Sequence, residues 1–169
     1  TGTPEHAFVV YKEMLKDDSL HPNGHTFVPL LKACVKQKCA KKALEIHAEI
    51  ARIGILETDT FVASALVDAY VKCGFLLKAH ETLDKLSIQN IVSWTILIAG
   101  YVDHGYGEKA LESYEQMQRG GVSPDSVAFI CTLKACGSIR ALNKGQEIHV
   151  EIERQGGIAD KDLLVTNAL

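Results

Sequence analysis

The apolar positions of residues 91–125 recur at spacings of three and four, which predicts two amphipathic helices. The first helix is marked by Val92, Trp94, Ile96, Leu97, Ile98 and Tyr101. The second helix is marked by Ala110, Leu111, Tyr114 and Met117. Gly105 and Gly107 separate the two stripes, and Gly120, Gly121 and Pro124 end the second one. The segment therefore predicts a helical hairpin.

The same hairpin recurs along the chain. Residues 27–34 and 129–136 share the pattern F-x-x-x-L-K-A-C, and residues 45–54 and 147–156 share E-I-H-x-E-I-x-R-x-G. Weaker matches relate residues 70–79 to 101–110. So many identities in the same order indicate internal repeats.

These matches divide the chain into units of unequal length. We expect one array over 1–169, which opens with a partial unit, 1–23. The complete units are 24–59, 60–90, 91–125 and 126–162, and residues 163–169 open another. A single hairpin cannot cover its own apolar surface, so neighbouring hairpins must stack. The prediction is an all-α α-solenoid with the first helices lining its concave face.

Composition narrows the function only slightly. The net charge of −3 and the pI near 6.1 argue against a simple polybasic nucleic-acid binder, although local basic faces remain open. No apolar run approaches the roughly 20 residues that span a bilayer, so no membrane association is expected. No signal peptide or targeting segment is recognised.

The five cysteines include no C-x-x-C pair, which favours a reduced compartment and small buried side chains. Cys34 and Cys39 have the same spacing as Cys131 and Cys136, but only Cys34 and Cys136 are equivalent in the repeat. We therefore expect no metal site and no cofactor.

Two H-x-E motifs match the zinc deaminases, in which a histidine binds zinc and a glutamate moves protons. They are His47-x-Glu49 and His149-x-Glu151. The accompanying P-C-x-x-C is absent, and both motifs fall at one repeat position. Both histidines are expected to pack between helices, and the chain is not expected to be an enzyme.

Three motif types in order resemble the pentatricopeptide repeat family, in its plant PLS-type subclass. TFVPLLKACVKQKCAKKALEIHAEIARIGI resembles the long motif, FVASALVDAYVKCGFLLKAHETLDKL the short one, and NIVSWTILIAGYVDHGYGEKALESYEQMQRGGVSPD the standard one. The resemblance implies a right-handed α-solenoid that binds single-stranded RNA, one base per repeat. It also implies a role in RNA processing or C-to-U RNA editing in the mitochondrion or chloroplast.

The resemblance assigns base contacts to the fifth and last residues of each motif. It implies that Ser64 with Asn90 prefers adenine, and that Thr95 with Asp125 prefers guanine. In the unit that begins at 163, Asn167 favours a pyrimidine. The second residue of each motif holds the base between two side chains. These residues are Phe61, Val92, Val127 and Leu164, with His25 in the first long unit.

The long units offer weaker contacts. Val28 with Asp59 and Ile130 with Asp162 place an aliphatic side chain, which cannot hydrogen-bond, at the fifth position. Asn23 closes a unit whose fifth residue lies before the chain. The resemblance implies a readout of roughly 5′-N-A-G-N-Y-3′.

Simpler interpretations of these residues stay open. Ser64 and Thr95 are also explained as polar residues on an exposed helical face, and Asn90 and Asp125 as N-caps of the following helices. A different function is a scaffold that binds a peptide in the concave face. The partial units at both ends also predict end-to-end homo-association. Lysines at 41, 42, 78 and 109 are expected to face solvent, some of them near phosphates.

Overall fold

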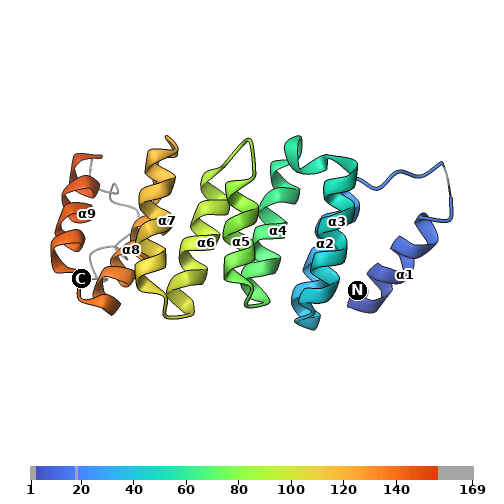
Figure 1. The fold of residues 1–169 in the computed structure, drawn as a ribbon, viewed down its shortest axis with the longest axis horizontal. Coiled ribbons are helices and arrows are strands. Elements are labelled where there is room, and N and C mark those ends of the chain that lie inside the picture. Colours follow the sequence, from blue (N-terminus) through green and yellow to red (C-terminus); the bar gives the residue numbers. More distant parts are fainter. Residues whose placement is uncertain (1–2, 18, 156–169) are drawn as a thin grey trace. The chain divides into compact units, whose positions relative to one another are not determined.

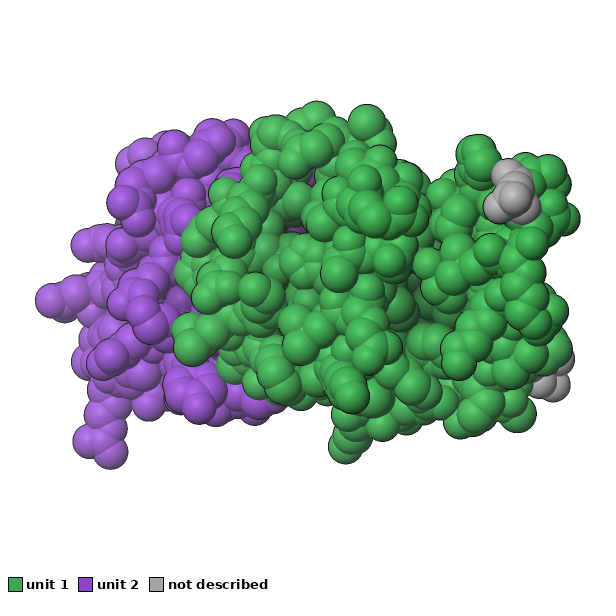
Figure 2. All heavy atoms as spheres, turned by 45° about the vertical axis from the view of Figure 1, so that its right-hand side comes forward, with its two compact units in different colours: residues 1–88 green, residues 89–169 purple. Residues whose placement is uncertain are grey.

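The computed structural model describes residues 3–17 and 19–155, and all regular structure within them is helical (Figure 1). The chain forms two compact units, residues 1–88 and residues 89–169, which Figure 2 distinguishes by colour. None of the helices in the described ranges is long and apolar enough to cross a membrane.

Unit 1 contains five α-helices and a short 3-10 helix within its described residues. They are α1 (Pro4–Met14), α2 (Gly24–Gln37), α3 (Ala40–Ile53), η1 (Ile55–Glu57), α4 (Thr60–Lys72) and α5 (Leu76–Asp84). Helix α2 packs against α1, α3 and α4, and α4 packs against α5. The hairpins α2–α3 and α4–α5 therefore stack through their first helices (Figure 1).

Unit 2 repeats this arrangement in its described part. Its helices are α6 (Ile91–Asp103), α7 (Gly107–Arg119), α8 (Ser126–Ile139) and α9 (Leu142–Arg154). Helix α8 packs against α6, α7 and α9. The first helices α6 and α8 are thus neighbours, as α2 and α4 are in unit 1.

Residues that repeat in the sequence pack in the same way in both units. Phe27 and Phe129 are both buried, and each ring lies against a tyrosine of the preceding second helix. The ring centroids of Tyr11 and Phe27 are 6.1 Å apart, and those of Tyr114 and Phe129 are 6.2 Å apart. The F-x-x-x-L-K-A-C stretches therefore occupy the same place in both units.

The turn between the two helices of a hairpin differs between unit types. Gly74 and Gly105 end the first helices α4 and α6 with φ of 81° and 79°, the left-handed region that glycine enters without strain. In the long units Lys38 and Arg140 stand there, with φ of 47° and 57°. A non-glycine residue in this region costs roughly 1–2 kcal/mol, so the long units store strain at this turn.

Helix α7 begins at a close approach to α8. A Cβ atom added to Gly107 would lie 2.6 Å from both Ile139 Cγ2 and Ser138 Oγ. The glycine therefore allows the start of α7 to lie directly on the end of α8.

Candidate nucleic-acid interface

Within residues 19–155, the residue that closes a unit lies at the start of the first helix of the next unit. The side-chain Oδ1 atoms of Asp59, Asn90 and Asp125 accept backbone N–H groups of the first turn at 2.7–3.1 Å. Asn23 is joined to the side chain of Thr26: its backbone N–H donates to Thr26 Oγ1 at 3.4 Å, and Thr26 Oγ1 donates to Asn23 Oδ1 at 3.5 Å. Capping is thus one role of these side chains. It also holds each of them in a fixed orientation at the start of a first helix.

Thr95 and Asp125 come together although they are far apart in sequence. Thr95 is half-buried on α6, Asp125 is exposed in front of α8, and Thr95 Oγ1 donates to Asp125 Oδ1 at 3.4 Å. The backbone N–H of Ala128 donates to the same Oδ1 at 2.7 Å. Since a carboxylate has a second oxygen, Asp125 can accept a further hydrogen bond through Oδ2.

Ser64 stands at the matching position of α4, five residues after the capping Asp59. It is half-buried, and its Oγ donates to the carbonyl oxygen of Thr60 at 2.8 Å. Ser64 belongs to unit 1 and Asn90 to unit 2. Their joint contact with one base therefore remains a prediction from the sequence.

The second residue of each first helix is turned toward solvent. Phe61, Val92 and Val127 expose 83%, 54% and 52% of their surfaces. His25, at the same position of α2, is also exposed. Each of these residues lies three positions before a fifth residue, so the two share one helical face. An exposed apolar side chain there offers a surface on which a base can stack.

The long units present a different fifth residue. Val28 on α2 and Ile130 on α8 are half-buried. Neither side chain has a polar atom, so neither can recognise a base edge. Three further candidate residues lie outside the described residues: Asp162, Leu164 and Asn167.

One residue of each H-x-E motif contacts the neighbouring hairpin, whereas His149 lies 3.6 Å from Glu153 of its own helix with 45% of its side chain exposed. His47 Nδ1 lies 2.8 Å from the hydroxyl of Tyr70, and Glu151 accepts a hydrogen bond from the hydroxyl of Tyr114 at 3.1 Å. Burial lowers the pKa of His47 and raises the pKa of Tyr70 to about 12. Among the residues that the structure describes, no group of three or more His, Cys, Asp or Glu side chains could hold a metal ion.

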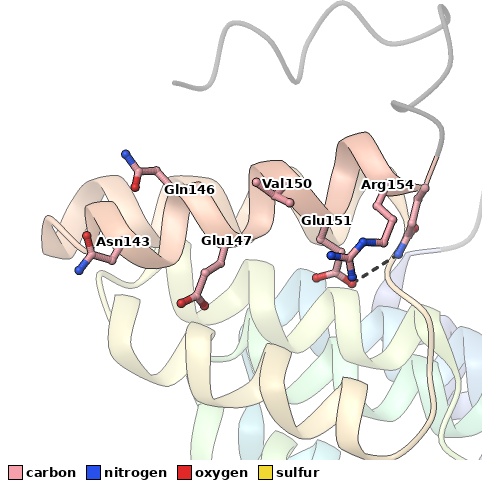
Figure 3. A pocket seen from close by; sticks show the side chains of 7 residues that line it. Asn143, Gln146, Glu147, Val150, Glu151 and Arg154 are labelled. Atoms are coloured by element: carbon pink, nitrogen blue, oxygen red, sulfur yellow. Dashed lines mark hydrogen bonds between the residues drawn. The ribbon is translucent and has the colours of Figure 1, made fainter.

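A polar hollow follows the second helix α9 (Figure 3). Its lining mixes both charge signs, including Glu147, Glu151 and Arg154, and Gln155 Nε2 donates to Glu151 Oε1 at 3.4 Å. None of the residues that the sequence assigns to base contact lies in it. The hollow therefore adds nothing to the first-helix interface.

The lysines expected near phosphates lie on second helices. Lys78 Nζ is 3.2 Å from Glu81 Oε2, and Lys109 Nζ is 2.6 Å from Glu112 Oε2. Two lysines outside that expectation, Lys32 and Lys134, are exposed on the first helices α2 and α8. Their recurrence in the repeated L-K-A-C stretch is the sequence feature that identifies them.

Stacked hairpins with matching side chains on their first helices define an α-helical repeat protein. Models of the PPR repeat match residues 25–55 and 61–91, and a PPR repeat family model matches residues 89–138. The chain belongs to the pentatricopeptide repeat family.

The curated relatives are much longer than this chain. The chloroplastic pentatricopeptide repeat-containing protein DOT4 of Arabidopsis thaliana is 36% identical over 139 residues, which cover 82% of this chain and 16% of DOT4. A mitochondrial member from the same plant is 31% identical over 150 residues, 89% of this chain and 19% of that protein. The chain thus spans less than a quarter of these relatives.

Solved structures confirm the expected α-solenoid fold. Maize PPR10 superposes with a TM-score of 0.75 at 21% identity, over 94% of this chain and 23% of PPR10. PPR10 in complex with an 18-nt psaJ RNA element gives 0.70 at the same identity, over 95% of this chain and 24% of that one. The nuclear protein-only RNase P 2 of Arabidopsis thaliana gives 0.71 at 15% identity, over 88% of this chain and 34% of that chain.

Proposed function

We propose that this chain is a single-stranded RNA-binding segment of an organellar RNA-processing factor, in which first helices contact successive bases. The observation that carries the proposal is the hydrogen bond of 3.4 Å between Thr95 Oγ1 and Asp125 Oδ1, beside the exposed Val92. Membership of the family, the RNA complex of PPR10 and relatives named as chloroplastic or mitochondrial all support it.

The Thr95–Asp125 pair selects guanine in this proposal. A carboxylate only accepts hydrogen bonds, so Asp125 favours bases with an imino N–H donor, which are guanine and uracil. The fifth residue then selects by size, because the short Thr95 leaves room for a purine. Val92 and Val127 lie on the neighbouring helices α6 and α8 and hold the base between them.

The other units extend this reading. Ser64 with Asn90 selects adenine, and Asn167 favours a pyrimidine, within the readout 5′-N-A-G-N-Y-3′. The order of long, short and standard motifs supports our proposal that the parent protein belongs to the PLS-type subclass and acts in RNA processing such as C-to-U editing. This chain supplies binding and not catalysis.

We expect this chain to bind RNA with modest affinity, because only two pairs of residues recognise bases. Two base-reading pairs at roughly 1–3 kcal/mol each supply about 2–6 kcal/mol before the costs of association. That corresponds to dissociation constants on the order of tens of millimolar to tens of micromolar. Each additional repeat in a longer array adds to this free energy.

The substitution Thr95→Asn tests the proposal. Asparagine reaches further than threonine and so contacts the smaller pyrimidine ring. We expect the variant to change the preference at one RNA position from guanine to uracil. The measurement is fluorescence anisotropy with four oligonucleotides that differ only at that position, and Thr3→Asn, on an exposed threonine before α1, is the matched control.

Two results would overturn the proposal. One is equal binding of the four RNAs by the unaltered chain. The other is a preference that Thr95→Asn leaves unchanged. Saturable binding of an extended peptide that displaces no RNA would instead support the scaffold function.

A further inference from the structure

The first helix of each long unit carries a lysine four residues beyond its aliphatic fifth position. Lys32 follows Val28 on α2, and Lys134 follows Ile130 on α8. Residues four apart lie on the same helical face, separated by about 6 Å along the axis. Both lysines therefore extend the face that carries the second and fifth residues.

The other units place no available cation at this position. Asp68 occupies it on α4 and forms an ion pair with Lys72 at 2.9 Å, and Ala99 occupies it on α6. In the described part of the chain, Lys32 and Lys134 are exposed and form neither an ion pair nor a hydrogen bond. An unpaired lysine at this position is thus specific to the long units.

Lys134 lies on the helix that Asp125 caps, α8. The same helix carries the half-buried thiol of Cys131, whose pKa is raised mainly by burial. Lys134 lowers the pKa of this thiol, and Asp103 and Asp125 raise it. The charges of Lys134 and Asp125 therefore both act on one group of α8.

We propose that Lys32 and Lys134 bind phosphate groups of the RNA, so that the long units hold the backbone while short and standard units recognise bases. This inference rests on the RNA-binding function proposed above. It explains why the fifth residue of each long unit, Val28 or Ile130, is aliphatic and is followed four residues later by a lysine. A lysine binds phosphate as a compact charge with three donors, and such contacts position an RNA without selecting its sequence.

The salt dependence of binding tests the inference. Each phosphate contact on a single strand contributes about −0.7 to the slope of log K against log salt concentration. We expect Lys134→Ala and Lys32→Ala each to make the slope shallower by about 0.7. When the salt concentration rises tenfold, the affinity of the unaltered chain falls by some factor. The affinity of each variant should fall by a factor about five times smaller. Because phosphate is common to every sequence, the preference for guanine should stay unchanged.

The experiment uses the whole chain and an AG-centred oligonucleotide, with anisotropy measured between about 20 and about 200 mM KCl. Lys134→Arg keeps the charge and should keep the slope. Lys41→Ala removes an exposed lysine from the second helix α3 and is the matched control. A shallower slope for the two first-helix variants, but not for the control, supports the inference.

The failures of the two proposals are distinguishable. If the unaltered chain binds RNA with a guanine preference, and Lys134→Ala gives the slope of Lys41→Ala, the phosphate role is wrong and base reading stands. If the guanine preference of Lys134→Ala is lost, the lysine contacts a base, and the inference is also overturned. If the unaltered chain binds no RNA, the proposed function fails and this inference fails with it.

Discussion

Asp125 caps a helix and is proposed to recognise a base, and two substitutions separate the observed role from the proposed one. In the unaltered chain the N–H of Ala128 donates to Asp125 Oδ1 at 2.7 Å. Asp125→Asn keeps an oxygen that can accept this bond but replaces the second oxygen by an NH2 donor. Asp125→Ala removes both functions. Only the alanine variant should lose stability, whereas both variants should lose the preference for guanine.

The expected magnitudes follow from the geometry. Loss of an N-cap costs about 1 kcal/mol, and asparagine caps about as well as aspartate. For a chain of this size, about 1 kcal/mol corresponds to a fall of about 2–4 °C in the melting temperature. In Asp125→Asn the new Nδ2 donor faces the donor edge of guanine but can donate to adenine N1. Discrimination of about 1–3 kcal/mol should therefore turn toward adenine, a change of about 5- to 150-fold.

Thermal melting followed by circular dichroism measures the first effect, and anisotropy with guanine- and adenine-containing RNAs measures the second. Asp59→Asn is the matched control. Asp59 caps α4 in the same manner, through bonds of 2.9 and 3.1 Å, but the fifth residue of its unit is the aliphatic Val28. We expect it to change neither property. The reasoning is refuted if Asp125→Asn melts like Asp125→Ala, or if it keeps the preference for guanine.

Two further predictions concern stability. Arg140→Gly should stabilise the chain by about 0.5–1 kcal/mol, because glycine relieves the left-handed φ of 57° at a smaller entropic cost. Gly105→Ala at the equivalent turn should destabilise it, and thermal melts showing the reverse order would contradict the strain. Burial lowers the pKa of His47 from 6.5, so as the pH falls the unfolded chain is protonated at His47 before the folded chain is. The stability from His47 is present above about pH 6.5 and is lost as the pH falls through the folded-state pKa. His47→Gln should therefore destabilise the chain less at about pH 5.5 than at about pH 7.5; equal effects in urea unfolding would show that burial does not disfavour the proton.

The hairpins were predictable because residues at the helix ends themselves mark the boundaries of the helices. Gly105 and Gly107 mark the turn between the end of α6 at Asp103 and the start of α7, and Gly120 follows the end of α7. At Gly105 the φ of 79° ends the helix, a conformation that glycine enters without strain. The turns of the long units could not be predicted in this way. Lys38 stands where the other units have glycine, and it takes the left-handed conformation because the surrounding hairpin imposes it.

The candidate site was predictable only in part. The resemblance fixed the register of Thr95 and Asp125, but their hydrogen bond depends on how α8 packs against α6. The repeat position of the H-x-E string predicted that His47 packs between helices, but its partner, the hydroxyl of Tyr70, is known only from the structure. Lys134 recurs in the sequence as part of the L-K-A-C stretch, but an exposed lysine is common, and its lack of an ionic partner is visible only in the structure.

The net charge of −3 does not conflict with RNA binding, because charge matters where the ligand lies. Second helices keep much of their charge in ion pairs, such as Lys109 with Glu112 at 2.6 Å and Lys144 with Glu115 at 2.8 Å. Paired charges contribute little field beyond their own surroundings. Lys134 on a first helix has no such partner among the described residues, so its charge remains available to a phosphate. In the proposed function, the distribution of ion pairs, rather than the sum of charges, therefore decides which face of the hairpins attracts RNA.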